Sequence, residues 1–277
     1  MRIKAILTIL FSICALNMGA QTLTATYVQL ADSADRYIRQ ERWADAERVI
    51  VKALRHEPAN KSNYLLWSNL GLVRTELKDY DGALQAYDIG LASAPKSTML
   101  LSNRARTYLA KGDRKAAMTD LDAALQNDST LQWPRKMRGL LKVATGDVKG
   151  ATADFEYYKE KFGDDASVSE AMGDIANMRG DTEGAIEDYK EAYRLSKEAD
   201  LLEKMLITSL MAGRLDKEEE DLAEGIRKFP RNGTLYLLRA MLNKSRYQTQ
   251  AMEKDLATAK SLGVDKTLYD QLTATPR

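Results

Sequence analysis

Residues able to carry catalysis or hold a metal are few in this sequence, and they are scattered. The chain has one histidine, His56, and one cysteine, Cys14, so it offers neither a histidine pair for a metal site nor an intramolecular disulfide. No Gly-x-Ser-x-Gly motif marks a nucleophilic serine, and no glycine-rich loop could cradle a phosphate. We therefore expect no catalytic residues, no metal and no cofactor.

The acidic residues are the remaining source of chemistry. The 40 Asp and Glu could supply a carboxylate pair of the kind that hydrolyses glycosides, which keeps a hydrolase as the weakest of three interpretations. The densest run, residues 216–221, is more simply a solvated helix face. The 41 Lys and Arg leave a net charge of +1, so bulk charge gives no reason to expect nucleic-acid binding. A composition with 44% hydrophobic and only 7% aromatic residues favours a globular, helical protein.

The segment 1–20 has the pattern of a secretory signal peptide. Arg2 and Lys4 precede an apolar run from Ala5 to Leu16, and the segment ends with the small residues Gly19 and Ala20, although Met18 is bulkier than the residue usual at its position. The run is shorter than the roughly 20 residues that span a bilayer, so an uncleaved anchor is the less favoured alternative. We predict cleavage after Ala20 and an exported, soluble protein. The lysine-containing leader and the Gln21 start resemble those of exported Bacteroidota proteins.

An internal repeat of about 34 residues organises the rest of the chain. Gly-Asp pairs begin at positions 112, 146 and 180, and an alanine follows five residues after each glycine. Each unit reads as two helices joined by a turn, in which glycine adopts the left-handed conformation and the aspartate caps the second helix. Other recurring small residues indicate where two helices approach closely. Residues 64–77 and 82–93 are the expected helices of the second unit.

The repeat predicts the domain organisation. A polar lead at 21–26 precedes a repeat array at 27–266, and a C-terminal cap and tail occupy 267–277, with Leu268, Tyr269 and Leu272 expected to cover the last unit. One spacing recurs between Arg104 and Asp120, between Arg138 and Asp154 and between Arg239 and Asp255, and we predict an ion pair across each helix pair. The expected units are 27–60, 64–97, 98–131, 132–165, 166–198, 199–232 and 233–266.

The second unit carries a family resemblance. Trp67-x-x-Leu70-Gly71, followed by Ala83, Tyr87, Gly90 and Pro95, resembles the signature of the tetratricopeptide repeat (TPR). The resemblance implies an all-α, right-handed superhelical solenoid of about seven helix–turn–helix repeats. The sixth unit departs from the pattern with Leu206 and Glu218 at small-residue positions, and the seventh has Tyr247 near the turn where glycine is expected.

The resemblance also implies a binding groove lined by the first helix of each unit. Asn69 and Asn103 match the family's groove asparagine, which can donate to and accept from a peptide backbone. Trp133 is the expected apolar anchor, with Arg106 and Lys136 adding positive charge. The alternative is that the asparagines only stabilise their helices and Met99 and Met137 only fill gaps. The implied groove positions are Leu65, Ser68, Asn69, Leu72, Met99, Ser102, Asn103, Arg106, Trp133, Lys136, Met137 and Leu140.

Acidic residues take the groove positions of the fifth and sixth units. Glu170, Asp174, Asp200 and Glu203 lie there, which predicts a groove that is positive in the middle and negative toward the C-terminus. Asp35 in the first unit would repel a carboxylate, so the chain departs from TPR domains that clamp a peptide's C-terminus.

The resemblance and the leader together predict a non-enzymatic adaptor or scaffold of the bacterial cell envelope. Its partner is expected to be a protein or peptide held in the groove, without nucleic acid or a small-molecule cofactor. The alternative is a structural subunit of an envelope or outer-membrane assembly, with a fixed partner on the same surface. Either interpretation places the protein in the periplasm or at the outer membrane.

Overall fold

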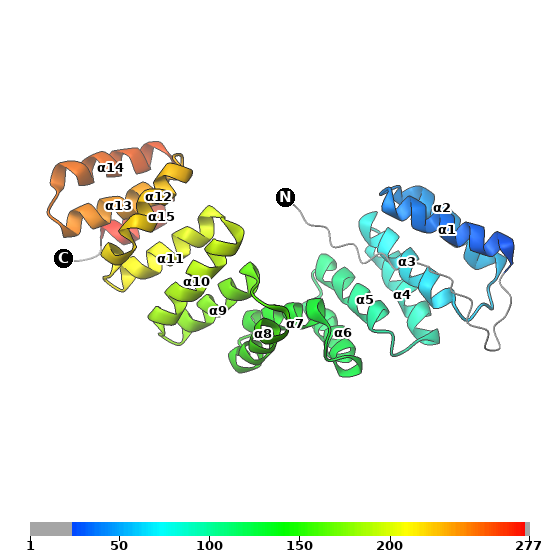
Figure 1. Ribbon diagram of the computed structural model, residues 1–277. Helices are drawn as coiled ribbons and strands as arrows, with labels where there is room; N and C mark the ends of the chain where they lie inside the picture. Colours follow the sequence, from blue (N-terminus) through cyan, green and yellow to red (C-terminus); the bar gives the residue numbers. More distant parts are fainter. Residues whose placement is uncertain (1–23, 275–277) are drawn as a thin grey trace. The chain divides into compact units, whose positions relative to one another are not determined.

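The computed structural model describes residues 24–274, which form α-helices joined by short turns (Figure 1). The leader expected at 1–20, the residues up to 23, and residues 275–277 lie outside the described range. Residues 24–274 contain fifteen α-helices, one 3₁₀ helix and no β-strand, so the prediction of an all-α fold is confirmed. None of these helices is long and apolar enough to cross a membrane.

The helices divide into two compact units, with the boundary between Leu141 and Lys142. The first unit contains α1 (Ala25–Arg39), α2 (Trp43–His56), α3 (Asn63–Glu76), α4 (Tyr80–Ser93), α5 (Thr98–Lys111), α6 (Arg114–Asn127) and most of α7 (Gln132–Ala144). The second contains α8 (Val148–Phe162), α9 (Ala166–Met178), α10 (Thr182–Ser196), α11 (Ala199–Met211), η1 (Leu215–Glu218), α12 (Glu219–Lys228), α13 (Gly233–Ser245), α14 (Thr249–Ser261) and α15 (Lys266–Thr273).

Consecutive helices pack as pairs inside each unit. In the first unit α1 packs on α2, α3 on α4 and α5 on α6, and the helices α2 and α4 also pack on the first helix of the next pair (Figure 1). In the second unit α9 with α10 and α13 with α14 repeat the arrangement. This is the helix–turn–helix array that the sequence repeat predicts.

The turns have the predicted chemistry. Gly112, Gly146 and Gly180 have φ values of 90°, 80° and 75°, in the left-handed region that glycine enters without strain. The aspartate after each glycine caps the second helix, as Asp113 does by accepting a 2.9 Å hydrogen bond from the backbone N–H of Ala116. Three turns within helix pairs have a similar φ without glycine, at Glu41, Lys78 and Tyr247, and Lys197 has one in the turn after α10.

Small residues lie where the paired helices approach most closely, as predicted. A Cβ added to Gly71 would lie 2.5 Å from the ring of Tyr87, and one added to Gly173 would lie 2.6 Å from the ring of Tyr189. The two tyrosines hold the same position in their repeats, on the second helix of each pair. Because the glycine has no side chain, the ring occupies the space between the two helices.

The sixth pair is distorted where both of its small positions are enlarged. Leu206 and Glu218 are buried at these positions, and the second helix begins as the 3₁₀ helix η1 before α12 starts at Glu219. We attribute the irregular start to the extra volume that the two side chains need in a closely packed pair.

The C-terminal helix covers the last pair. Leu272 of α15 is buried in the core of the second unit, and Leu268 and Tyr269 pack against the same core. These are the three side chains that the sequence analysis expects to cover the last unit. α15 thus shields apolar side chains that would otherwise face water.

Candidate functional site

The groove residues predicted for the second, third and fourth repeats lie on α3, α5 and α7, within the first unit. We call the surface made by their side chains the A face, since these are the first helices of three pairs. Ser68 is buried, whereas every other member is half-buried. The half-buried members are Leu65, Asn69, Leu72, Met99, Ser102, Asn103, Arg106, Trp133, Lys136, Met137 and Leu140.

The two groove asparagines keep hydrogen-bonding capacity unused. Asn103 donates one Nδ2 hydrogen bond, of 3.2 Å, to the hydroxyl of Ser68 on the neighbouring first helix. Its Oδ1 accepts no hydrogen bond from residues 24–274, and the amide of Asn69 has no side-chain partner in that range. Because an amide can donate and accept at once, both side chains can pair with a peptide backbone. Asn103 therefore combines a structural role with a free acceptor.

Arg106 and Trp133 form the charged and aromatic part of the A face. The guanidinium carbon of Arg106 lies 4.4 Å from the centroid of the Trp133 ring, a cation–π contact between α5 and α7. Burial lowers the pKa of Arg106, although an arginine remains charged at neutral pH. Within the described chain, Arg106 forms no salt bridge. Its charge is therefore available to a carboxylate that approaches from outside.

The apolar members of the A face serve the core as well. Trp133 and Met137 pack against the buried cluster that contains Ala105 and Leu121, and Leu72 packs against the cluster formed by α1–α4. Part of each of these side chains therefore packs in the core. The other part is exposed and can contact a partner, so a packing role and a binding role are compatible.

The predicted arginine–aspartate pairs are present in two repeats. Arg104 donates two hydrogen bonds to Asp120, at 2.8 and 2.7 Å, and Arg239 binds Asp255 in the same way at 2.9 and 2.7 Å. Arg104 also binds Asp88 of the preceding pair at 2.6 Å, which was not predicted. Asp88 precedes Arg104 by the same interval that separates Arg104 from Asp120. This backward spacing is visible in the sequence and could have indicated the second contact.

In the fourth repeat, Arg138 belongs to the first compact unit and Asp154 to the second, and each forms a different ion pair inside its own unit. Arg138 binds Asp122 of the preceding pair at 3.1 Å, over the same interval in the sequence. Asp154 accepts a 2.9 Å hydrogen bond from Lys142 in the second unit. The pair Arg138–Asp154 stays a prediction.

A lysine lies among the acids around Asp174. Lys204, at the helix position that Asn69 and Asn103 hold in earlier repeats, binds Glu170 at 2.7 Å and Asp174 at 3.1 Å. Although burial lowers the pKa of Lys204, its hydrogen bonds to the two carboxylates outweigh this effect and raise the pKa above its usual range. The sequence interpretation counted the acids and overlooked this lysine.

The other acids of this set behave separately. Tyr189 donates a 2.7 Å hydrogen bond to Asp174, and burial together with this bond raises the pKa of the phenol. Glu203 accepts a hydrogen bond from the amide of Asn232, while Asp200 is exposed. A single groove with opposite charges at its two ends stays a prediction, because the A face and Asp174 belong to different units.

The single histidine lies at the end of a helix, as expected. His56 is the last residue of α2, and its Nε2 lies 3.1 Å from the hydroxyl of Thr24. In residues 24–274, no three histidine or carboxylate side chains gather in an arrangement suited to a metal ion.

Comparison with known families agrees with this geometry. The tetratricopeptide repeat profile matches two segments of the chain, residues 32–98 and 136–200. The chain is a tetratricopeptide repeat protein. No curated protein matches it significantly, so the family rests on the repeat profile, and solved structures bear on the fold alone.

Three solved structures resemble the TPR protein in fold. A tetratricopeptide repeat protein from Parabacteroides merdae ATCC 43184 is 23% identical, with a TM-score of 0.63 over 91% of this chain and 98% of that one. PilW, a widely conserved type IV pilus biogenesis factor, is 18% identical, with a TM-score of 0.60 over 77% and 98%. YrrB, a TPR protein with an unusual peptide-binding site, is 18% identical, with a TM-score of 0.57 over 67% and 95%. At these identities, the likeness concerns the fold alone.

Proposed function

We propose that this TPR protein is a non-enzymatic adaptor or scaffold that binds a peptide segment of another protein on its A face. The observation that carries the proposal is a set of half-buried polar groups whose hydrogen-bonding capacity is unused within residues 24–274, together with an aromatic ring. The set comprises the amide of Asn69, the carbonyl oxygen of Asn103 and the guanidinium of Arg106, which stacks on Trp133. Polar groups so placed gain most from a ligand that replaces water.

Each group has a defined task in such a complex. The amides of Asn69 and Asn103 pair with the main chain of the bound segment, whose own N–H and C=O groups need partners. Trp133 contacts an apolar side chain, and Arg106, held in place by that ring, binds an acidic side chain of the partner. The bound segment is therefore expected to combine apolar and acidic residues.

The family and one structural neighbour support this use of the surface. Stacked helix pairs present an extended binding surface, and YrrB is a TPR protein with a peptide-binding site. We carry that function to the A face because of the groups described above, since the likeness to YrrB itself concerns only the fold.

The cellular location belongs to the same proposal. The basic and then apolar opening of the sequence supports export to the periplasm or outer membrane of a bacterium. A structural subunit of an envelope assembly is the second candidate function, favoured by the likeness in fold to the pilus biogenesis factor PilW. The two functions differ in the partner, which is exchangeable for an adaptor and permanent for a subunit.

Site-specific photocrosslinking in envelope extract tests the proposal. A photoreactive amino acid at Met99 is expected to capture a partner, whereas the same probe at the exposed Lys115 of α6 is expected to capture none. Replacing Asn69 and Asn103 together by alanine should weaken capture at Met99 by about tenfold or more, because two hydrogen bonds of about 1 kcal/mol each are lost.

Circular dichroism provides the control for the double variant. Its helicity should be unchanged, since neither asparagine caps a helix. Equal capture from Met99 in the wild type and the variant would contradict the A-face assignment. A partner that co-purifies at equal stoichiometry through high salt would favour the structural subunit.

A further inference from the structure

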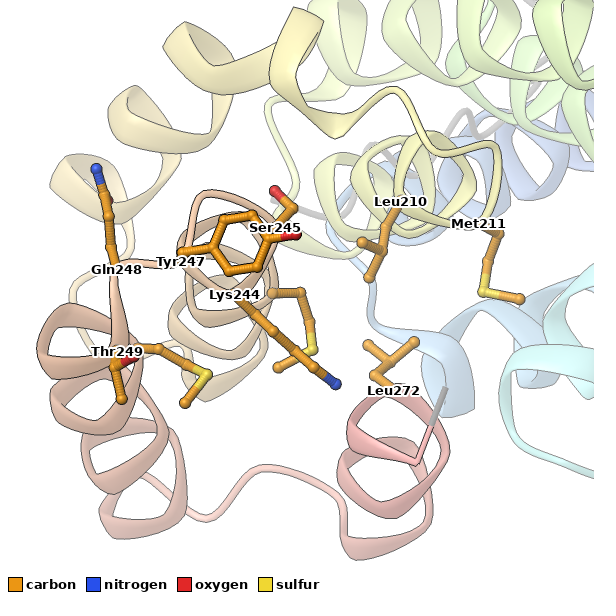
Figure 2. Close-up of a pocket in the computed structure, with 10 residues that line it drawn as sticks. Leu210, Met211, Lys244, Ser245, Tyr247, Gln248, Thr249 and Leu272 are labelled. Atoms are coloured by element: carbon orange, nitrogen blue, oxygen red, sulfur yellow. The ribbon is translucent and has the colours of Figure 1, made fainter. Parts of the chain in front are cut away.

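A second surface with the features of a binding site lies in the second unit and shares no residue with the A face. A pocket of about 580 Å³ opens between the ends of α11 and α13, the start of α14 and the end of α15 (Figure 2). Its size falls in the range of ligand sites. It is lined by Leu210, Met211, Met241, Lys244, Ser245, Tyr247, Gln248, Thr249, Met252 and Leu272.

Large apolar side chains at the pocket's edge are left in solvent. Met211 is 61% exposed at the end of α11 and Tyr247 is 88% exposed in the turn after α13. Met178, at the end of α9 in the preceding pair, is 64% exposed. The three thus mark the same turn end of successive helix pairs. Exposed apolar side chains such as Met211 and Tyr247 beside a pocket are typical of surfaces that bind another protein, and methionine adapts to varied partners.

Tyr247 occupies its position at a cost to stability. It has a φ of 57° at the turn position where Gly112, Gly146 and Gly180 lie in other repeats. A side chain in the left-handed region is strained, because its Cβ lies too close to the following carbonyl oxygen. Since the ring is almost fully exposed, packing does not offset this cost.

The pocket also contains one unbalanced charge. The half-buried Lys244 extends across the pocket toward Leu272 (Figure 2). Its Nζ donates a long hydrogen bond, of 3.4 Å, to the carbonyl oxygen of Thr273. No carboxylate within residues 24–274 lies at salt-bridge distance from it. A cation in a mostly apolar pocket matches a ligand that brings an apolar group and a carboxylate together.

We propose that this pocket is a second protein-binding site, for a partner segment with a large apolar side chain next to an acidic one. The apolar side chain enters between Met211, Met241 and Met252, and the acidic side chain binds Lys244. The ring of Tyr247 covers the entrance. A peptide fits better than a small amphiphile, because a molecule confined to the pocket would leave Met178, which is not part of the lining, in solvent.

Methionine methyl signals test the proposal in the full chain. The probe is the peptide Gly-Ser-Gly-Glu-Phe-Glu-Gly-Ser-Gly, titrated into protein labelled with ¹³C at the methionine methyl groups. We expect saturable shifts at Met211, Met241 and Met252. A matched peptide with lysine in place of both glutamates should bind about tenfold more weakly, as should one with serine in place of phenylalanine.

Two variants separate recognition from folding. Lys244→Glu should lower affinity for the glutamate peptide about tenfold and favour the lysine peptide. Tyr247→Gly should weaken binding while it raises the thermal midpoint, because it removes the left-handed side chain. Lys78→Gly, which replaces a left-handed residue by glycine in the second repeat, should leave the peptide affinity unchanged.

Three results would overturn the proposal. Shifts confined to Met99 and Met137 would exclude this second site and support the A face instead. Affinity that does not respond to Lys244→Glu would exclude the charge contact on which the site depends. Saturation of the pocket signals by decanoate without any response to the peptide would assign the pocket to a small amphiphile.

Discussion

At the scale of single residues, the turns within helix pairs adopt a left-handed backbone conformation whether or not the residue there is glycine. The turn is left-handed at Gly112 and equally so at Lys78, where φ is 65°. The path is therefore imposed by the paired helices, and a lysine there is strained. A non-glycine residue keeps the fold but loses part of its stability.

Replacing Lys78 by glycine should stabilise the first unit by about 1 kcal/mol, because the left-handed strain is removed. Urea denaturation followed by tryptophan fluorescence measures the change. The matched control is Gly112→Ala, which should destabilise by about the same amount through the backbone alone, since no atom lies within 4 Å of the added Cβ. A loss of stability in the lysine variant would show that its side chain is needed.

Tyr27 links stability to alkaline pH. Burial, with a smaller contribution from the charge of Glu57, raises the pKa of this phenol from 10.0 to about 12. Its hydroxyl donates a 2.9 Å hydrogen bond to Asn63. Because the folded pKa exceeds the unfolded one, the stability that the neutral phenol contributes is complete below pH 10 and is lost as the pH rises toward 12.

Tyr27→Phe tests this linkage. At pH 8 the variant should be less stable than the wild type by about 1 kcal/mol, because the side chain of Asn63 loses its donor. At pH 11 the difference should shrink by about 1 kcal/mol, since only the wild type has a phenol whose ionisation favours the unfolded state. Denaturation curves at the two pH values measure it. A difference that stays constant from pH 8 to 11 would show that Tyr27 does not titrate with folding.

Residue-level prediction from the sequence succeeded where position in the repeat decides the role. The capping role of Asp113 and the pairing of Arg104 with Asp120 follow from spacing alone. It failed at Lys204, whose effect depends on which acids of the preceding repeat it meets. A repeat pattern specifies the backbone position of a residue, whereas charge pairing depends on where the charged group at the tip of a flexible side chain lies.

At the scale of helices, glycine and tyrosine act as one packing unit. The ring of Tyr87 fills the space that Gly71 leaves, and its burial raises the pKa of the phenol to about 12. In the next pair the same positions hold Ala105 and Leu121, both buried. Where the first helix of the pair has alanine in place of glycine, the second helix has leucine in place of the larger tyrosine.

Gly71→Ala should destabilise the first unit by about 1–3 kcal/mol, because the new Cβ meets the ring of Tyr87. Combining it with Tyr87→Leu should cost less than the sum of the two single changes, since the pair then resembles Ala105 and Leu121. A double-mutant cycle by urea denaturation gives the coupling energy. Strict additivity would mean that the two positions do not share this space.

The helices were largely predictable, but their irregularities were not. The expected helix at 64–77 is observed at 63–76, and the one at 82–93 begins at Tyr80. The substitutions at Leu206 and Glu218 were visible in the sequence, yet their consequence, the 3₁₀ start of the sixth pair's second helix, depends on how the pair makes room. The pocket beside Tyr247 was missed for a related reason, since it is built by four helices together.

At the scale of the whole molecule, each compact unit has a core of its own. The clusters around Ile50, Tyr87 and Leu121 belong to the first unit, and the cluster around Leu202 belongs to the second. In repeat arrays, stability is roughly a sum of local terms and contacts between neighbours. Damage in one core should therefore remain largely local.

Leu202→Ala tests this locality. Removing this fully buried side chain should destabilise the second unit by about 2–5 kcal/mol. All three tryptophans, Trp43, Trp67 and Trp133, lie in the first unit, so their fluorescence reports that unit while circular dichroism reports both. We expect an early transition by circular dichroism and an unchanged tryptophan midpoint. Coincident shifts would show that the two units unfold together.

The two-sided contact of Arg104 bears on how such a gene can grow. This arginine binds one acid ahead of it and another behind it, at equal intervals in the sequence. If residues 98–131 were duplicated in tandem, the copied arginine would follow the original Asp122 by the interval that Arg138 already uses. The added repeat would then contain both the arginine that binds the preceding repeat and the aspartate that binds the following one. A length change that is not a whole repeat would break both contacts, so the pattern favours evolution by whole-repeat steps.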